Sequence, residues 1–106
     1  CMLHTALFEG EGVVVAEAAA AGVVVCGTSV GLIADLGEGG AVQVAPGDDA
    51  SLAEAVLRLL ADADRYARLQ ESARRWASIH TPAWTAGEFF DLYDRLPNRG
   101  GANARL

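Results

Sequence analysis

The hydrophobic pattern divides the chain into short apolar runs that alternate with segments of helical character. An apolar run without polar alternation occurs at residues 23–26, which is typical of a parallel strand buried on both faces. A second strand is expected over residues 41–45, with Val42 and Val44 on one face. Residues 1–8 have the character of a strand end and its exit loop. Because parallel strands need crossover connections, this alternation predicts an α/β fold with right-handed crossovers.

Helices are expected between these strands. Residues 13–21 are rich in alanine and are followed by Gly22, which is well placed as a C-terminal stop. The three valines at 13–15 favour a strand, but the glycine turn before them and the stop after them indicate a helix from about Val13. Ser29 is a candidate cap for a short helix over residues 30–36.

From Asp48 onward the pattern is helical. Asp48 is one candidate cap of the first helix in this part, and Ser51 with Glu54 forms an alternative capping box. This helix runs through Ala61, and one apolar stripe indicates the face that packs against the sheet. The stripe consists of Leu52, Val56, Leu59 and Leu60.

Two further helices are expected. The first covers residues 64–79, and Thr81 and Pro82 break it. Its expected buried side consists of Tyr66, Leu69, Ala73 and Trp76. The second covers residues 84–96 and has a wide apolar surface, whose aromatic members more commonly belong to a core than to a ligand-stacking surface. They are Trp84, Phe89, Phe90 and Tyr93. We therefore expect one domain over residues 1–96 and a flexible tail over 97–106.

Composition and charge narrow the function classes. With 52% hydrophobic and 21% charged residues, the chain has the composition of a globular domain. The net charge of −6 disfavours nucleic acid as a partner, because neutralising phosphates requires a basic face. Cys1 and Cys26 form neither a disulfide framework nor a metal-binding spacing. The sequence also has no signal peptide and no apolar run long enough to span a membrane.

The strongest candidate for a functional segment is residues 8–22. Gly10 and Gly12 allow positive φ and close approach to a ligand, and a helix start follows them. Unpaired N–H groups and a partial positive charge at such a start attract phosphate. Glu9 and Glu17 flank this turn with seven residues between them. One anionic ligand with hydroxyls on both sides, such as a sugar nucleotide, would reach both carboxylates.

Several of these residues also have ordinary structural interpretations. On spacing alone, Glu9 is more simply a solvated loop carboxylate. His4 is more simply a hydrogen-bonded structural residue than a catalytic group. Cys26 is more simply a small buried residue. Residue type and spacing therefore leave the role of Glu9 open.

Four motifs in order resemble one family. The run E-G-E-G-V-V-V-A-E-A at residues 9–18, followed by A-G-V-V-V at 21–25, resembles the E-G-F-G-L-V-V-L-E-A…C-G-T-P-V-V signature of the retaining GT-B glycosyltransferases of family 4. Residues 29–35 resemble the V-G-G-I-P-E loop of that family, residues 44–48 its V-P-P-G-D turn, and residues 83–93 its closing helix between a tryptophan and a tyrosine. The resemblance covers most of the chain.

The resemblance implies a fold and a site. The fold is the C-terminal portion of a GT-B fold, a partial Rossmann-like parallel sheet with flanking helices. Glu9 would be the catalytic residue, beside the transferred sugar and near its anomeric carbon, and Glu17 would accept hydrogen bonds from the nucleotide ribose. The remaining residues of the turn would bind the sugar and the diphosphate, largely through backbone amides. They are Gly10, Glu11, Gly12 and Val13.

The resemblance also implies a reaction and partners. A sugar would pass from a nucleoside-diphosphate sugar to an acceptor sugar, lipid or small molecule, with retention of anomeric configuration and without a metal or other cofactor. An arginine or lysine pair and an N-terminal domain that packs against the last helix would precede these residues, so we expect the 106 residues to be an inactive part of a larger enzyme. We expect that enzyme in the cytoplasm, with peripheral attachment to the inner face of the membrane through the missing domain as one option.

The sequence departs from the family pattern at two positions. Glu11 replaces an aromatic residue, and a carboxylate beside a diphosphate repels it unless it points away. Val24 replaces a proline at a strand entry.

Two other interpretations remain. A dinucleotide-binding half-domain would use Gly10 and Gly12, but Val15 occupies the place of the third glycine of that fingerprint and no acidic residue ends the next strand. A non-catalytic α/β module would instead use its last helix to dock a partner, with Glu9 and Glu17 incidental.

Overall fold

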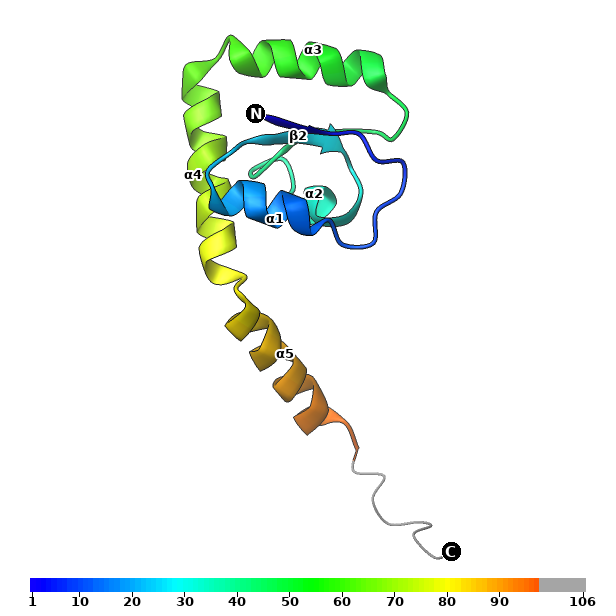
Figure 1. Cartoon of the computed structure of the whole chain (residues 1–106), viewed down its shortest axis with the longest axis vertical. Helices are drawn as coiled ribbons and strands as arrows, with labels where there is room; N and C mark the ends of the chain where they lie inside the picture. Colours follow the sequence, from blue (N-terminus) through cyan, green and yellow to red (C-terminus); the bar gives the residue numbers. More distant parts are fainter. Residues whose placement is uncertain (98–106) are drawn as a thin grey trace, which may run out of the picture.

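The computed structural model describes residues 1–97. In it a parallel sheet of three strands is flanked by helices (Figure 1). The strands β1 (Met2–His4), β2 (Val25–Thr28) and β3 (Val42–Val44) lie in the order β1-β2-β3. Leu3 pairs with Cys26, and Gly27 pairs with Gln43. The predicted fold class, a Rossmann-like parallel sheet with flanking helices, is confirmed.

Five helices connect and cover these strands within the described residues. They are α1 (Val13–Ala20), α2 (Gly31–Leu36), α3 (Asp49–Leu60), α4 (Ala63–Ile79) and α5 (Pro82–Arg95). In Figure 1, α1 and α2 lie on one side of the sheet and α3 lies on the other. Helix α4 runs past both layers, and α5 extends away from them.

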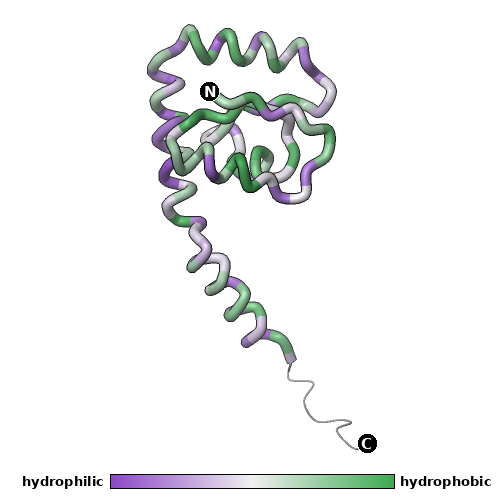
Figure 2. Tube along the Cα trace, in the orientation of Figure 1, coloured by the Kyte–Doolittle hydropathy of each residue, from purple (hydrophilic) through white to green (hydrophobic). Residues whose placement is uncertain are grey.

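The sheet carries a hydrophobic cluster on each face, because successive side chains of a strand point to opposite faces. One cluster joins the sheet to α3 and α4 and consists of Val24, Cys26, Val42, Leu52, Leu59 and Leu69. The other joins it to α1 and α2 and consists of Val15, Ala18, Val25, Ile33 and Ala41. Figure 2 shows the strands and α1 as mostly hydrophobic. Burial raises the pKa of the Cys26 thiol, so this residue acts as a small apolar core member.

Helix α1 ends where the sequence predicts. Gly22 has a φ of 73°, and its N–H donates to the Ala19 carbonyl at 3.0 Å while the Val23 N–H donates to the Ala18 carbonyl at 2.8 Å. These two bonds form a Schellman end. Because Val23 is still part of this helix end, the strand begins at Val25, and the predicted strand over residues 23–26 was placed two residues too early.

The predicted cap of the second helix is wrong. The Ser29 hydroxyl donates to Oε1 of Gln43 at 2.8 Å, which ties the exit of β2 to β3. Helix α2 begins at Gly31, after Val30, without a side-chain cap. The hydroxyl therefore joins two strand ends and leaves the helix start uncapped.

Helix α3 distinguishes between the two predicted caps. The Ser51 N–H donates to Oδ1 of Asp48 at 3.0 Å, so Asp48 is the cap. Leu52 and Leu59 are buried and Val56 packs partly buried against them. The fourth member of the predicted stripe, Leu60, is 60% exposed, because it lies off the face that α3 turns toward the sheet.

Helices α4 and α5 meet at a short joint. Helix α4 buries Leu69 and Ala73, as predicted, and Tyr66 packs partly buried beside them. Thr81 caps α5 through a bond from the Trp84 N–H. The ring of His80 stacks on Trp76 and meets Trp84 edge-on, with ring centroids 4.3 and 4.6 Å away.

No residue of α5 is buried. The aromatic side chains on it that were expected in the core are exposed, with Phe90 at 71% and Tyr93 at 65%, because the helix extends away from the sheet. Of the predicted tail 97–106, residues 98–106 lie outside the described residues. No helix within residues 1–97 has both the length and the apolar composition that crossing a membrane requires.

The contact between β1 and β2 generates the first prediction. A Cβ atom at Gly27 would lie 2.1 Å from the His4 carbonyl oxygen and 2.7 Å from Cδ1 of Ile33. We expect Gly27→Ala to force β1 and α2 outward and to lower the free energy of unfolding by about 1–3 kcal/mol, the usual effect of overpacking. Urea unfolding measures this loss. Gly39→Ala is the control, since a Cβ there meets nothing within 4 Å, and equal loss in both variants would contradict the prediction.

The cap of α3 generates the second prediction. The hydrogen bond from the Ser51 N–H lowers the pKa of Asp48 below its ordinary value of 3.8. A carboxyl group whose pKa is lowered by folding adds stability above its unfolded pKa, and this stability is lost as the pH falls through the folded pKa. We expect Asp48→Ala to lower the thermal midpoint at pH 7, and the difference from wild type to shrink below about pH 3.8. Glu38→Ala, at an exposed position without a capping bond, should show no such pH-dependent difference.

Candidate functional site

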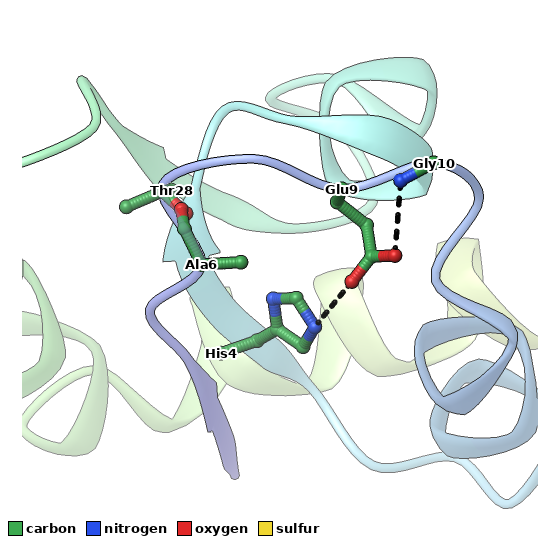
Figure 3. Close-up of polar contacts among 5 residues, drawn as sticks. All are labelled: His4, Ala6, Glu9, Gly10 and Thr28. Atoms are coloured by element: carbon green, nitrogen blue, oxygen red, sulfur yellow. Dashed lines mark hydrogen bonds and ion pairs between the residues drawn. The ribbon is translucent and has the colours of Figure 1, made fainter.

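The candidate site is built on residues 5–12, which we call the Glu9 loop, between β1 and α1. Two contacts hold this loop against the ends of the neighbouring elements. The Thr28 hydroxyl at the end of β2 donates to the Ala6 carbonyl, and Figure 3 shows these two residues close together. The Leu32 N–H in α2 donates to the Glu11 carbonyl at 3.1 Å. The loop therefore crosses the carboxyl edge of the parallel sheet, where ligands bind in open α/β folds.

Glu9 lies half-buried within this loop, and both of its carboxylate oxygens have a partner (Figure 3). The Gly10 N–H donates to Oε1 at 3.1 Å. Nε2 of His4, the last residue of β1, lies 3.4 Å from Oε2. The carboxylate is therefore held in place and is not a freely solvated loop side chain.

Two glycines make room for the stem of Glu9. A Cβ at Gly31 would lie 2.8 Å from Cγ of Glu9 and 3.0 Å from the Glu11 carbonyl oxygen. A Cβ at Gly12 would lie 3.3 Å from the same Cγ. Both glycines have positive φ, 51° at Gly31 and 84° at Gly12, so each position also favours glycine by backbone conformation.

The start of α1 presents free backbone donors. Gly12 is the N-cap residue and provides no side-chain bond. Within residues 1–97, the N–H groups of Glu11, Gly12 and Val13 donate to no protein group. A helix start with unpaired N–H groups is an anion-binding arrangement, and it lies directly beside the Glu9 carboxylate in the chain.

Glu17 lies apart from this cluster. It follows Val13 by one helical turn on the exposed face of α1, since residues four apart share a face. Its carboxylate has no hydrogen bond or ion pair with any side chain in residues 1–97. The side chain of Glu11 is also exposed, so it can point into solvent while its backbone stays fixed by Leu32.

The structure thus brings some of the predicted site residues into contact and leaves others separate. The Glu9 side chain accepts a hydrogen bond from Gly10 and lies against Gly12. Val13 supplies a free amide, and Glu11 and Glu17 offer exposed carboxylates. Sequence reasoning gave His4 only a structural role and assigned no role to Gly31, although Gly31 belongs to a motif that carries the resemblance. The contact between the His4 ring and Glu9 could not be predicted from their separation in the sequence, because it depends on the loop between them turning back toward β1.

A small pocket of about 110 Å³ lies at the same edge of the sheet. Its lining includes Thr5 and Leu7 of the Glu9 loop, Thr28 at the end of β2 and Asp48 before α3. Among residues 1–97, no group of His, Cys, Asp and Glu side chains is arranged to hold a metal ion. The expectation of a reaction without a metal remains a prediction.

Comparison with known proteins assigns the family. The fold and the loop define an α/β domain with a candidate anion site at the carboxyl edge of its sheet. The family model of group 1 glycosyl transferases matches residues 1–76, so the chain belongs to this family. A comparison with curated protein sequences gave no match. The chain therefore carries a glycosyltransferase domain, and the partners of such a domain are a nucleotide sugar as donor and an acceptor.

The packing of Gly31 on Glu9 generates the third prediction. We expect Gly31→Ala to displace the Glu9 loop, because its Cβ would meet both Cγ of Glu9 and the Glu11 carbonyl. Gly37→Ala at the other end of α2 is the control for backbone strain alone, since Gly37 has a φ of 64° and a ψ of −175°, a conformation essentially restricted to glycine, but a Cβ there meets nothing within 4 Å. Amide chemical shifts should change over residues 9–13 in Gly31→Ala and stay near wild type there in Gly37→Ala. The same shifts in both variants would mean that backbone strain, and not the contact with Glu9, dominates.

Proposed function

We propose that this chain is the donor-binding part of a retaining glycosyltransferase of the GT-B type, family 4, which transfers a sugar from a nucleoside-diphosphate sugar to an acceptor. The observation that carries the proposal is the arrangement around Glu9. A carboxylate held by His4 and the Gly10 amide stands next to a helix start with free N–H groups, inside the segment that matches the family. The family match covers these residues, and their local chemistry supports an anion site there.

The free amides suit the leaving group of the reaction. When the bond between the sugar and the diphosphate breaks, negative charge grows on the β-phosphate. The N–H groups of Glu11, Gly12 and Val13 are already oriented and unpaired, so they would stabilise this charge without reorganisation. A helix start contributes about 0.3–2 kcal/mol to such an interaction, which is too little to account for catalysis by itself.

Cationic groups must supply the remainder. Residues 1–57 contain no lysine or arginine, because the first of the eight arginines is Arg58. We infer that an arginine or lysine pair elsewhere in the full-length enzyme completes the phosphate site, and that residues 1–106 alone do not catalyse transfer. The net charge of −6 is consistent with a chain that provides the acidic half of the site.

Glu9 and Glu17 have separate roles in this proposal. Glu9, next to the transferred sugar, binds its hydroxyls and stabilises positive charge near the anomeric carbon. Glu17, one turn into α1, accepts hydrogen bonds from the ribose hydroxyls. A hydrogen bond to a carboxylate contributes about 1.5–3 kcal/mol when the ligand shields it from water. The exposure of Glu17 fits this role, because a residue that binds ribose must be accessible before the donor arrives.

The exposed face of α5 fits a contact with the N-terminal domain of the same enzyme. None of its residues is buried within residues 1–97, and its aromatic side chains are accessible. We propose that the N-terminal domain packs against this helix. An acceptor sugar, lipid or small molecule would then bind between that domain and the Glu9 loop.

The fourth prediction separates the roles of the two carboxylates in the full-length enzyme. Glu9→Gln should lower kcat by about 100-fold, because the charge that stabilises the transition state is lost, while nucleoside diphosphate affinity stays near wild type. Glu17→Ala should weaken nucleoside diphosphate binding by about tenfold or more, because it removes hydrogen bonds to ribose. Calorimetry with uridine, guanosine and adenosine diphosphates first identifies the base, and transfer assays then give kcat.

Glu38→Gln is the matched control for these variants, since Glu38 is exposed in the turn between α2 and β3. It should change neither quantity. If Glu9→Gln and Glu17→Ala also leave transfer and binding unchanged, both carboxylates are incidental. A docking module without donor chemistry in this loop would then be the better description.

A further inference from the structure

His4 is anchored more firmly than the residue it contacts. It is the last residue of β1 and pairs with Gly27 of β2, whose missing side chain lets the His4 carbonyl approach closely. Its side chain is only 15% exposed. Glu9 lies five residues later in a loop. The contact between Nε2 of His4 and Oε2 of Glu9, at 3.4 Å, therefore joins a loop carboxylate to a rigid strand end (Figure 3).

The second ring nitrogen indicates which tautomer this contact favours. Nδ1 of His4 is fully buried and has no hydrogen-bond partner among the described residues. A proton on Nδ1 alone would leave a buried donor unpaired and would turn the lone pair of Nε2 toward the carboxylate. A proton on Nε2 avoids both costs. The surroundings of the ring thus favour a proton on Nε2, the nitrogen that lies 3.4 Å from Oε2 of Glu9.

The other contacts of Glu9 leave one motion open. The Gly10 N–H binds Oε1, and Gly12 and Gly31 confine the stem at Cγ. Without His4, nothing in the described residues holds Oε2, so the carboxylate could rotate. A group that acts on a reacting centre must stay close to its productive orientation.

We propose that His4 is a positioning residue of the transfer reaction, which holds the Glu9 carboxylate toward the anomeric carbon through Oε2. This inference depends on the role proposed above for Glu9. His4 itself touches neither the diphosphate nor the reacting atoms in this proposal. Its loss should therefore lower kcat and leave nucleoside diphosphate binding unchanged.

The fifth prediction uses two substitutions at His4 in the full-length enzyme. His4→Leu keeps much of the side-chain volume and removes the N–H group, and we expect kcat to fall by about 10- to 100-fold, as for a misplaced catalytic group. His4→Gln places an amide N–H near the position of Nε2, and it should restore kcat to within about threefold of wild type. Nucleoside diphosphate affinity, measured by calorimetry, should be the same in all three proteins. A merely structural role would lower stability and affinity together and would not be rescued by glutamine.

A double substitution tests whether His4 acts through Glu9. In the Glu9→Gln background, His4→Leu should cause no further loss of kcat, because the group that it positions is already neutral. If His4→Leu lowers kcat in the Glu9→Gln background as much as it does in the wild type, the inference is overturned. It is also overturned if Glu9→Gln lowers kcat but His4→Leu alone does not. If Glu9→Gln alone leaves kcat unchanged, the proposed role of Glu9 fails first. If His4→Leu does not fold, His4→Asn takes its place, because the amide of asparagine is too short to reach Oε2 of Glu9. The inference then requires a lower kcat in His4→Asn than in His4→Gln.

Discussion

The structure depends on the close approach of backbone segments at glycines that have no room for a side chain. Gly27 lets β1 lie against β2 with the His4 carbonyl in contact, and Gly31 lets the Glu9 loop lie on the start of α2. Gly12, at positive φ, turns the chain from that loop into α1. The parallel sheet, the loop and the helix start are therefore packed as one unit. The orientation of Glu9 follows from this packing, because its stem lies against two of these glycines.

The elements that the sequence predicts correctly are those with a local physical signal. Gly22 ends α1 because it adopts a positive φ. Asp48 caps the start of α3 because its carboxylate accepts a hydrogen bond from the amide three residues later. The errors arise where a distant partner decides. Ser29 bonds Gln43 of a neighbouring strand and not the helix beside it. Leu60 is exposed although it belongs to the apolar stripe. The orientation of α3 on the sheet decides which residues of that stripe are buried. The aromatic residues of α5 are exposed because that helix lies away from the sheet.

In the candidate site, too, the features with a local signal can be predicted and those that depend on distant partners cannot. The glycine turn, the helix start and the paired glutamates can be found from residue types and spacing, and the family resemblance indicates their chemistry. The partners of Glu9 cannot be found in this way. His4 meets Glu9 only because the loop turns back over the sheet edge, and Gly31 meets it only because α2 packs beside that loop. Both contacts are products of the tertiary fold. Residue types and spacing therefore identify the candidate site residues and miss the neighbours that contact them in the fold.

The two ends of α1 differ in a way that affects how it acts on an anion. At its C-terminus, the Arg74 guanidinium of α4 lies against Gly22, and the Gln70 side chain donates to the Gly22 carbonyl. A positive group there counteracts the negative end of the helix dipole. At the opposite end the N–H donors stay unpaired within residues 1–97, and the Glu9 and Glu11 carboxylates lie beside them in the chain. The far end of α1 is therefore partly neutralised and repels an approaching phosphate little. At the near end the donors have to outweigh two carboxylates, so a cation beside them would strengthen the attraction.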